Sequence, residues 1–224
     1  MTRLGIVVLG DVIGSRLAGP ASSAWLRRLC AELDDVYGDD RIAPFGFTQG
    51  DELQGLLRPN ADPMQAVLRA SLREPRPPSM RWAVAAGEIE PGKGPATQRT
   101  GRAFLTAREL ATAARRRRDR LLVRSGDPMA DLLLDDIAPL LTVLLDGLTD
   151  RQRAIGRLLV VDGLRQVDVA DRLDIARPTV SVAAERAHVR DIERISRAIV
   201  GLLRLGIEGL VDPMSARTGG LQPA

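Results

Sequence analysis

Residues 45–54, Phe-Gly-Phe-Thr-Gln-Gly-Asp-Glu-Leu-Gln, constrain the fold of this chain more than any other stretch. Apolar and small residues alternate up to a Gly-Asp-Glu turn, and apolar residues resume at Leu53, Leu56 and Leu57. This pattern predicts a β-hairpin with acidic residues at its tip. A carboxylate at a hairpin tip can bind a hard cation such as Mg²⁺ or Mn²⁺, because these ions prefer oxygen ligands.

A second acidic residue, Asp11, follows the apolar strand that begins at Leu4. The expected strands are 4–11, 42–48, a strand ending at Leu57, 80–86 and 121–123, and the expected helices are 21–37, 63–73 and 102–117. This order predicts an α+β, ferredoxin-like domain, in which the end of the first strand lies beside the hairpin turn. Asp11 and Asp51 would then converge as metal ligands, as two-metal phosphoryl or nucleotidyl transfer requires. The alternative is that both aspartates only cap loops.

An acidic, leucine-rich segment divides the chain. Residues 127–148 carry five acidic and no basic residues, whereas the pieces on either side are net basic. We therefore expect an N-terminal domain over 1–126, a linker helix over 127–147, an all-α helix-turn-helix domain over 148–211 and a disordered tail over 212–224. Pro139 is expected to kink or split the linker. Its apolar stripe calls for a partner, either the N-terminal domain or another subunit.

Residues 165–181 carry a second motif. Ala170 is the small residue where two helices cross, Leu173 and Ile175 bracket a tight turn, and Val180 anchors the second helix. The spacing resembles the helix-turn-helix of sigma-factor region four and LuxR-type regulators. It departs at Asp174, where glycine is usual, although Asp tolerates the left-handed conformation. Thr149 is expected to cap the preceding helix, which runs to Val161.

The second helix of such a motif enters the major groove of double-stranded DNA. The expected base-reading residues are Arg177, Thr179, Ser181, Val182 and Glu185, and the expected backbone contacts are Arg165 and Gln166. The alternative is a helix-turn-helix that contacts only protein. A continuing helix over 187–205, with apolar residues at heptad-like spacing, predicts a homodimer or packing against residues 158–161.

Four motifs in the first half resemble the SatD family of bacterial proteins and, more distantly, class III nucleotidyl cyclases. They are Gly-Asp-Val-Ile-Gly-Ser-Arg at 10–16, Thr-Gln-Gly-Asp-Glu-Leu-Gln-Gly at 48–55, Ala-Gly-Glu-Ile at 86–89 and Gly-Arg-Ala-Phe-Leu-Thr-Ala-Arg at 101–108. The resemblance covers residues 4–118. It implies a cyclase-like palm domain with Asp11 and Asp51 as metal ligands. It also implies a nucleotide site at Gly14, Ser15, Arg16, Gly50 and Glu52.

Two departures from the cyclase pattern bear on activity. Leu105 stands where cyclases carry the asparagine that orients the sugar, and Glu109 stands where they carry the arginine that stabilises the transition state, with Arg108 one place away. Leucine cannot hydrogen-bond ribose, and glutamate repels phosphate. Because electrostatic stabilisation is often the largest catalytic contribution, the sequence identifies no catalytic residue and favours a binding domain over an enzyme.

The remaining features are less specific. Arg115 to Arg118 with Arg120 indicate either a phosphate-binding patch or the solvated end of a helix. Cys30 is the single cysteine and fits a core position in a reducing compartment. With neither a leader segment nor a membrane-spanning stretch in the sequence, we expect a cytoplasmic protein.

The leading hypothesis is a transcriptional regulator that binds DNA. Its palm domain senses a nucleotide or divalent metal, and the linker transmits occupancy. The alternatives are an active nucleotidyl cyclase or nucleotidyltransferase with an appended DNA-binding module, and a scaffold that binds only proteins.

Overall fold

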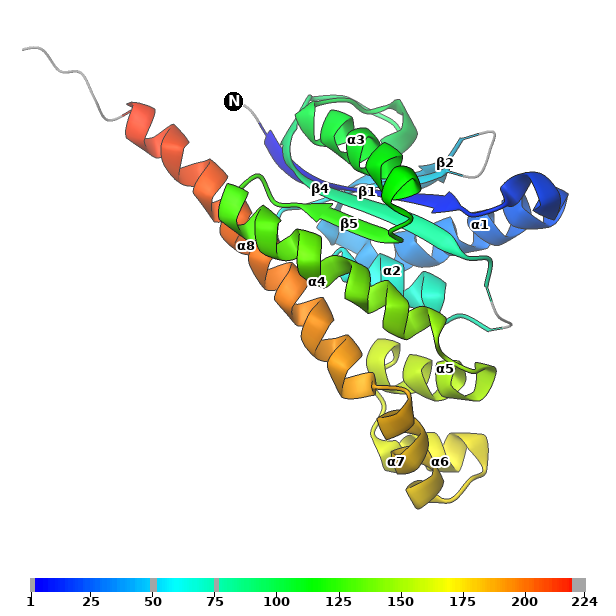
Figure 1. The fold of residues 1–224 in the computed structure, drawn as a ribbon. Helices are drawn as coiled ribbons and strands as arrows, with labels where there is room; N and C mark the ends of the chain where they lie inside the picture. The colour runs from blue at the N-terminus through cyan, green and yellow to red at the C-terminus, as the bar shows by residue number, and fades with distance from the viewer. Residues whose placement is uncertain (1–2, 49–51, 75–76, 219–224) are drawn as a thin grey trace, which may run out of the picture.

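The computed structural model describes residues 3–48, 52–74 and 77–218. Its first half alternates strands and helices, and its second half is helical (Figure 1). The first half contains β1 (Arg3–Val12), α1 (Ser15–Tyr37), β2 (Arg41–Phe47), β3 (Glu52–Leu57), α2 (Met64–Ser71), β4 (Met80–Ile89), α3 (Arg102–Arg117) and β5 (Leu121–Arg124). The second half contains α4 (Pro128–Asp146), α5 (Asp150–Gly156), the π-helical turn η3 (Arg157–Val161), α6 (Gln166–Leu173), α7 (Arg177–Arg186) and α8 (Val189–Thr218).

The described strands form one sheet in the order β2-β3-β1-β4-β5. The first four strands pair antiparallel, and β5 pairs parallel to β4 after the α3 crossover. This is the strand order of a β-α-β-β-α-β ferredoxin-like domain with one added strand. The predicted α+β, ferredoxin-like fold followed by helices is confirmed, and β5 confirms the short strand expected at 121–123.

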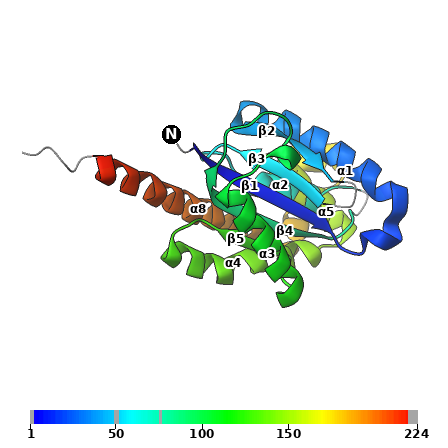
Figure 2. The same cartoon turned by 90° about the horizontal axis from the view of Figure 1, so that it is seen from above.

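Both faces of the sheet are buried, because its strands carry apolar residues at consecutive positions. In β1, Ile6 and Val8 point to one face, whereas Val7 and Leu9 point to the other. Helix α3 covers the second face, which we call the α3 face (Figure 2). Helices α1 and α2 and the helices of the second half cover the first face.

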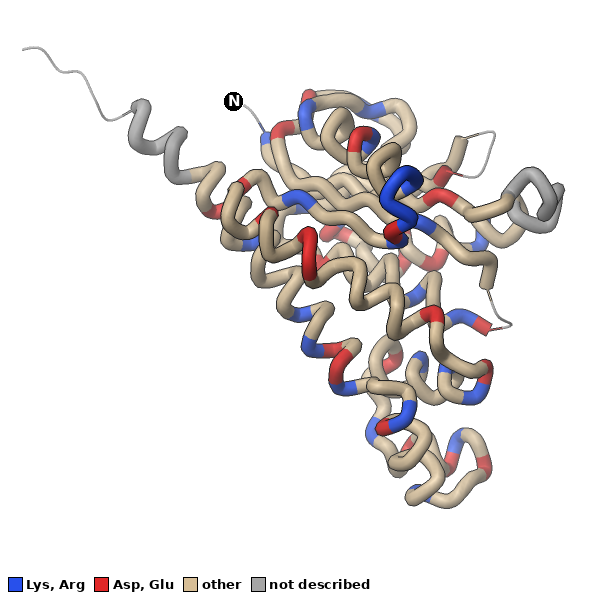
Figure 3. Tube along the Cα trace, in the orientation of Figure 1, with Lys and Arg blue, Asp and Glu red and all other residues tan. Residues whose placement is uncertain are grey.

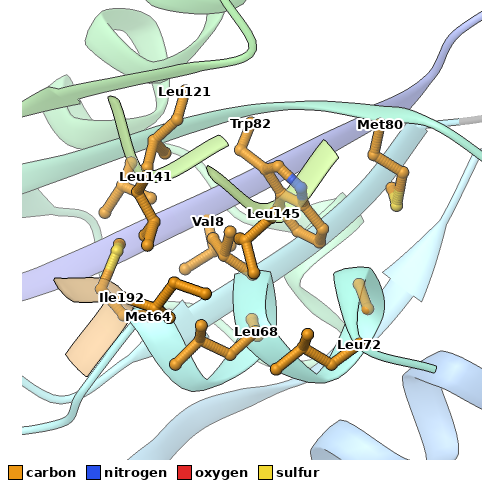
Figure 4. Close-up of a cluster of buried hydrophobic side chains, with 14 of the residues drawn as sticks. Val8, Met64, Leu68, Leu72, Met80, Trp82, Leu121, Leu141, Leu145 and Ile192 are labelled. Atoms are coloured by element: carbon orange, nitrogen blue, oxygen red, sulfur yellow. The ribbon is translucent and has the colours of Figure 1, made fainter. Parts of the chain in front are cut away.

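One hydrophobic core joins the sheet to the C-terminal helices. Figure 4 shows Val8 and Trp82 of the sheet beside Leu68 of α2, Leu145 of α4 and Ile192 of α8. The inner side of α4 therefore packs on the N-terminal domain, which is one of the two partners expected for its apolar residues. The helix runs through Pro139 as a single element and is not split. Buried Ala138 and Leu141 on either side of this proline hold it against the core.

Helices α7 and α8 are separate, although the sequence predicted one continuing helix from Ala187. The chain turns at His188, whose φ is 52°, and α8 begins at Val189. It extends to Thr218, well past the expected end near Leu205 and into the segment expected to be disordered. Ile192, Ile199 and Leu203 of its apolar side are buried in the same core as the sheet. Within the described residues, no helix has both the length and the apolar character needed to cross a membrane.

Candidate functional site

Three neighbouring strands bring charged residues into one row at the end of β1. Asp11 of β1 lies opposite Glu52 of β3 and opposite Arg81 of β4 in the sheet register. Directly opposed residues of antiparallel strands project to the same face. For this row it is the α3 face, because Asp11 lies two positions after Leu9 and four after Val7, and both of these belong to the core beneath α3. Strand pairing thus places two carboxylates and a guanidinium side by side.

Arg115, in the last turn of α3, reaches the same carboxylate from above. Its Nε and Nη2 each lie 3.1 Å from Asp11 Oδ2, and Arg81 Nη1 lies 3.6 Å from that oxygen. Asp11 itself is only 8% exposed. A carboxylate buried to this degree needs a compensating positive charge, and here two guanidinium groups supply it.

An unsatisfied oxygen lies beside this row, on Gln54, which is opposite Leu9. Gln54 is buried on the α3 face, and its Nε2 donates a hydrogen bond of 2.7 Å to Glu52 Oε1. Its Oε1 is buried without a hydrogen-bond partner among the described residues. Buried polar atoms are rarely left unpaired, so a cation or a ligand N–H group would satisfy this oxygen.

Asp11, Glu52 and Gln54 all carry side-chain oxygen atoms, which are the ligands that a hard divalent cation prefers. Within the described residues, however, no group of three or more His, Cys, Asp or Glu side chains could hold a metal. Asp51, the second expected metal ligand, and Gly50 lie outside the described residues. A cation at Asp11 would also have to displace Arg115, whose side chain is 53% exposed. Metal binding therefore stays a prediction.

The turn after β1 was expected to hold a nucleotide. Gly14 adopts a left-handed conformation with φ of 74° as the N-cap of α1, and a Cβ there would meet nothing within 4 Å. Ser15 and Arg16 begin α1, but their side chains lie outside the described part. The turn is thus open on the side where a ligand could approach the start of α1.

The outer side of α3 carries the residues at which the sequence departs from cyclases. Leu105, Arg108 and Glu109 are exposed. They line a hollow of about 590 Å³ together with Thr112, Ala113, Arg116 and Arg117. Neither a ribose-binding amide nor an arginine at the Glu109 position is present, so the described surface keeps the departures seen in the sequence.

Three arginines of the run at the end of α3 form ion pairs. Besides Arg115, Arg117 lies 3.5 Å from Asp135 of α4, and Arg120 lies 2.8 Å from Asp146. Figure 3 shows the basic cluster at the C-terminal end of α3. These pairs help hold the end of the palm domain against α4. Neither of the two expected interpretations, a phosphate patch or a solvated helix end, describes the run fully.

The helix-turn-helix is formed by α6 and α7. Val169 and Ala170 of α6 and Val180 and Ala184 of α7 are buried where the two helices meet. Asp174 ends α6 in the left-handed conformation, with φ of 50° and ψ of 53°. The predicted N-cap at Thr149 is also present, as a capping box with Gln152 at the start of α5.

Helix α7 presents its remaining face to solvent. All five residues expected to read bases are exposed: Arg177, Thr179, Ser181, Val182 and Glu185. Arg177 forms no ion pair within the part of the chain that the structure describes. Its guanidinium at the start of α7 is therefore available to an external acceptor.

The two expected backbone-contact residues differ in availability. Arg165 is the N-cap of α6, and its Nε and Nη2 lie 2.9 and 3.0 Å from the two carboxylate oxygens of Asp168. Hydrogen bonding from Arg165 lowers the pKa of Asp168. Gln166, the next residue, is half-buried. Arg165 would have to exchange Asp168 for a phosphate, whereas Arg177 needs no such exchange.

A family model for SatD matches residues 5–119, slightly more than half of the chain. The chain belongs to the SatD family. The match covers strands β1 to β4 with α1 to α3 and ends before β5 and α4, so the helix-turn-helix lies outside it. A search of curated proteins finds no match to this SatD-family chain.

Solved structures similar to the SatD-family chain have low sequence identity to it. Two are described as a bacterial light-regulated adenylyl cyclase. They are 16% and 14% identical, cover 55% of this chain each and 76% and 43% of their own chains, with TM-scores of 0.40 and 0.39. A third is described as a regulator of polyketide synthase expression from Bifidobacterium adolescentis. It is 15% identical and covers 90% of this chain and 86% of its own, with a TM-score of 0.26.

Sequence reasoning missed three residues of this candidate site: Arg81, Arg115 and Gln54. The Gly-Asp and Gly-Asp-Glu motifs pointed to the end of β1, where Asp11 lies opposite Glu52. Arg81 could be found only from the β1–β4 register, which sequence does not give. Arg115 lies 104 positions from Asp11 in the sequence, within a run whose charge alone did not single it out.

Proposed function

We propose that this SatD-family chain is a DNA-binding transcriptional regulator whose palm domain binds a nucleotide or divalent cation as an effector. The observation that carries the proposal is the exposed face of α7, which presents Arg177, Thr179 and Ser181 from a helix whose opposite face is buried against α6. Recognition helices of this motif meet base edges through their N-terminal residues. The head would act on two half-sites as a homodimer.

The DNA-binding part is tested with the full chain and duplexes selected from a random-sequence library. Affinity should fall linearly on a log–log plot against salt concentration, because phosphate neutralisation releases counterions. Arg177→Ala should weaken the selected complex by about 1–3 kcal/mol if the guanidinium reads guanine, and should relax preference at one base pair. Arg27→Ala, an exposed change on α1, serves as the matched control. Equal affinity of wild type and Arg177→Ala for every duplex would contradict the proposal.

The effector part rests on the row at the end of β1. Asp11, Glu52 and the unpaired Gln54 Oε1 supply oxygen donors, and the open Gly14 turn lies at the start of α1. A divalent cation bound there would supply positive charge for the phosphates of a nucleotide. Asp11 would hold the cation after Arg115 withdraws, and Glu52 would complete the oxygen set.

Thermal melting with Mn²⁺ or Mg²⁺ and each ribonucleoside triphosphate tests this part, with chromatography to detect any product. Asp11→Asn and Asp51→Ala should each abolish the melting shift, whereas Glu88→Gln at an exposed position of β4 should leave it intact. Arg115→Ala should increase the shift at a given Mn²⁺ concentration, because it removes the competing cation. A product that is lost in Asp51→Ala would instead make the chain an enzyme. The absence of both a melting shift and a product would refute the effector site.

A further inference from the structure

The outer side of α4 exposes five large apolar residues. Met129, Leu132, Leu133, Leu140 and Val143 are each 44–68% exposed, and we call them the α4 stripe. They recur at helical spacing over 14 positions, a length of about 21 Å. Single exposed apolar residues are ordinary, but a contiguous patch marks an interaction surface.

The stripe is not a by-product of packing α4 on the sheet. The residues that dock α4 are a separate set on the opposite side of the helix: Ala130, Leu134, Ala138, Leu141 and Leu145, all at most 5% exposed. Helix α4 is thus apolar on two opposite sides and uses only one of them. A helix that is apolar all round is usually buried all round.

Charge indicates what covers the stripe. Helix α4 contains no basic residue, and its one exposed charge in the middle of the stripe is Asp136. The neighbouring helix α8 packs alongside α4 and carries exposed arginines at 194, 197 and 204. A second copy would therefore bring basic residues of its α8 toward the acidic α4 of the first copy. The α8 of the first copy would meet the α4 of the second in the same way, as an isologous contact requires.

We propose that a second copy of this chain docks on the α4 stripe. Helices α4 and α8 run antiparallel as a pair in Figure 1, and two such pairs related by a two-fold axis would form a four-helix arrangement. A face of two helices, each about 10 Å wide and about 28 Å long, presents on the order of 600 Å². This is the lower end of what specific interfaces bury per partner.

The sequence left two uses open for the apolar side of α8, pairing two copies or packing against residues 158–161. Ile192, Ile199 and Leu203 are buried in the chain's own core together with Leu158, so these three residues are not available to a second copy. The α4 stripe remains exposed, and a dimer contact through this stripe would leave α7 of each copy exposed. The inference deepens the proposed homodimer and does not depend on DNA binding.

Sedimentation equilibrium of the full chain without DNA tests the inference. Wild type should be a dimer, and Leu132→Glu with Leu140→Glu should raise the dimer dissociation constant about 100-fold or more, because four carboxylates would be buried in an apolar contact. Val36→Glu is the matched control, because it also introduces a carboxylate at an exposed apolar position, here on α1. This variant should remain dimeric. Asp136→Arg should also weaken the dimer.

The outcomes separate two questions, whether the chain forms a homodimer and whether the α4 stripe is its interface. A wild type that stays monomeric refutes the homodimer as a whole. A dimer that persists in the double variant refutes only the α4 surface. Both substituted leucines are exposed, so folding should be kept, and circular dichroism checks this. If the glutamates disturb folding, Leu132→Ser with Leu140→Ser offers a milder form of the same test. DNA binding measured separately reports on α7 alone.

Discussion

Replacing Gly206 with alanine tests how closely α8 lies against the end of the sheet. A Cβ at this position would lie 2.4 Å from both Cβ and Oγ of Ser125 and 2.8 Å from its carbonyl oxygen. Ser125 is fully buried, and Asp131 Oδ1 accepts hydrogen bonds from its backbone N–H at 2.6 Å and from its hydroxyl at 2.8 Å. Because Ser125 cannot retreat without losing these bonds, α8 itself would have to move outward.

The magnitude follows from two opposing contributions. Alanine in a helix interior gains about 1 kcal/mol over glycine, and overpacking a close contact costs about 1–3 kcal/mol or more. Gly201 lies in the same helix with nothing within 4 Å of its Cβ position, so Gly201→Ala receives only the gain. We expect Gly201→Ala to raise Tm by about 2–4 °C and Gly206→Ala to lower it, the two variants differing by at least about 1 kcal/mol in the free energy of unfolding.

Urea unfolding followed by circular dichroism measures both changes under identical conditions. Ser125→Gly removes two of the three contacts and should reduce the cost of Gly206→Ala in a double-mutant cycle. If Gly206→Ala is as stable as Gly201→Ala, α8 does not approach Ser125, and the packing of the C-terminal helices on the sheet would have to be reconsidered.

Three further outcomes are expected. Thr149→Ala removes half of the capping box of α5 and should destabilise the chain by about 1 kcal/mol in urea unfolding. Burial raises the pKa of Asp62 above its ordinary value of 3.8. The protonated carboxyl therefore stabilises the folded state below about pH 4, and this stabilisation is lost as the pH rises through the raised pKa. Asp62→Asn keeps an acceptor for the Met64 N–H group and should raise Tm at pH 7, by an amount that shrinks below pH 4. Burial also raises the pKa of Cys30 to about 12, so a thiol reagent should label it only on unfolding, and rapid labelling of native protein would contradict its core position.

Much of the fold could be predicted because local patterns and global packing agree. The strand ending at Asp11, the hairpin strands and the crossover through α3 each followed from apolar runs and turn residues. The helix-turn-helix followed from spacing alone, even though Asp174 replaces the usual glycine. Its observed φ of 50° shows that Asp adopts the left-handed conformation the turn requires.

The errors arose where tertiary contacts override local signals. The heptad-like run after Ala187 contains no helix-breaking glycine or proline before Gly201, so nothing in the sequence marked the break at His188. Its apolar residues could equally serve a partner or the chain's own core, and only the position of α8 against the sheet decides between them. The row of Glu52, Asp11 and Arg81 depends on strand register in the same way, because sequence separation carries no information about which residues face each other.

Contacts connect the palm domain to the helix-turn-helix through α1 as directly as through α4. Glu32 of α1 accepts a hydrogen bond of 3.2 Å from Arg157 of η3, the turn that leads into the helix-turn-helix. It also pairs with Arg69 of α2 and with Arg73, which follows that helix. One carboxylate thus holds three guanidinium groups. Buried Arg69 Nε and Arg157 Nη1 have no hydrogen-bond partner within the described ranges.

Removing or shifting Glu32 would leave a surplus of positive charge between the palm and the helix-turn-helix, which is costly because these side chains are only 17–25% exposed. Helix α1 begins at the Gly14 turn and carries Glu32 in its C-terminal half. Any ligand that moves α1 as a rigid element would therefore disturb the Glu32–Arg157 pair directly. By contrast, Arg124 fixes α4 to β5 through two hydrogen bonds to Asp135, of 2.8 and 3.0 Å. For this reason α1, rather than the linker expected from the sequence, is the element better placed to carry a change at the palm site to η3.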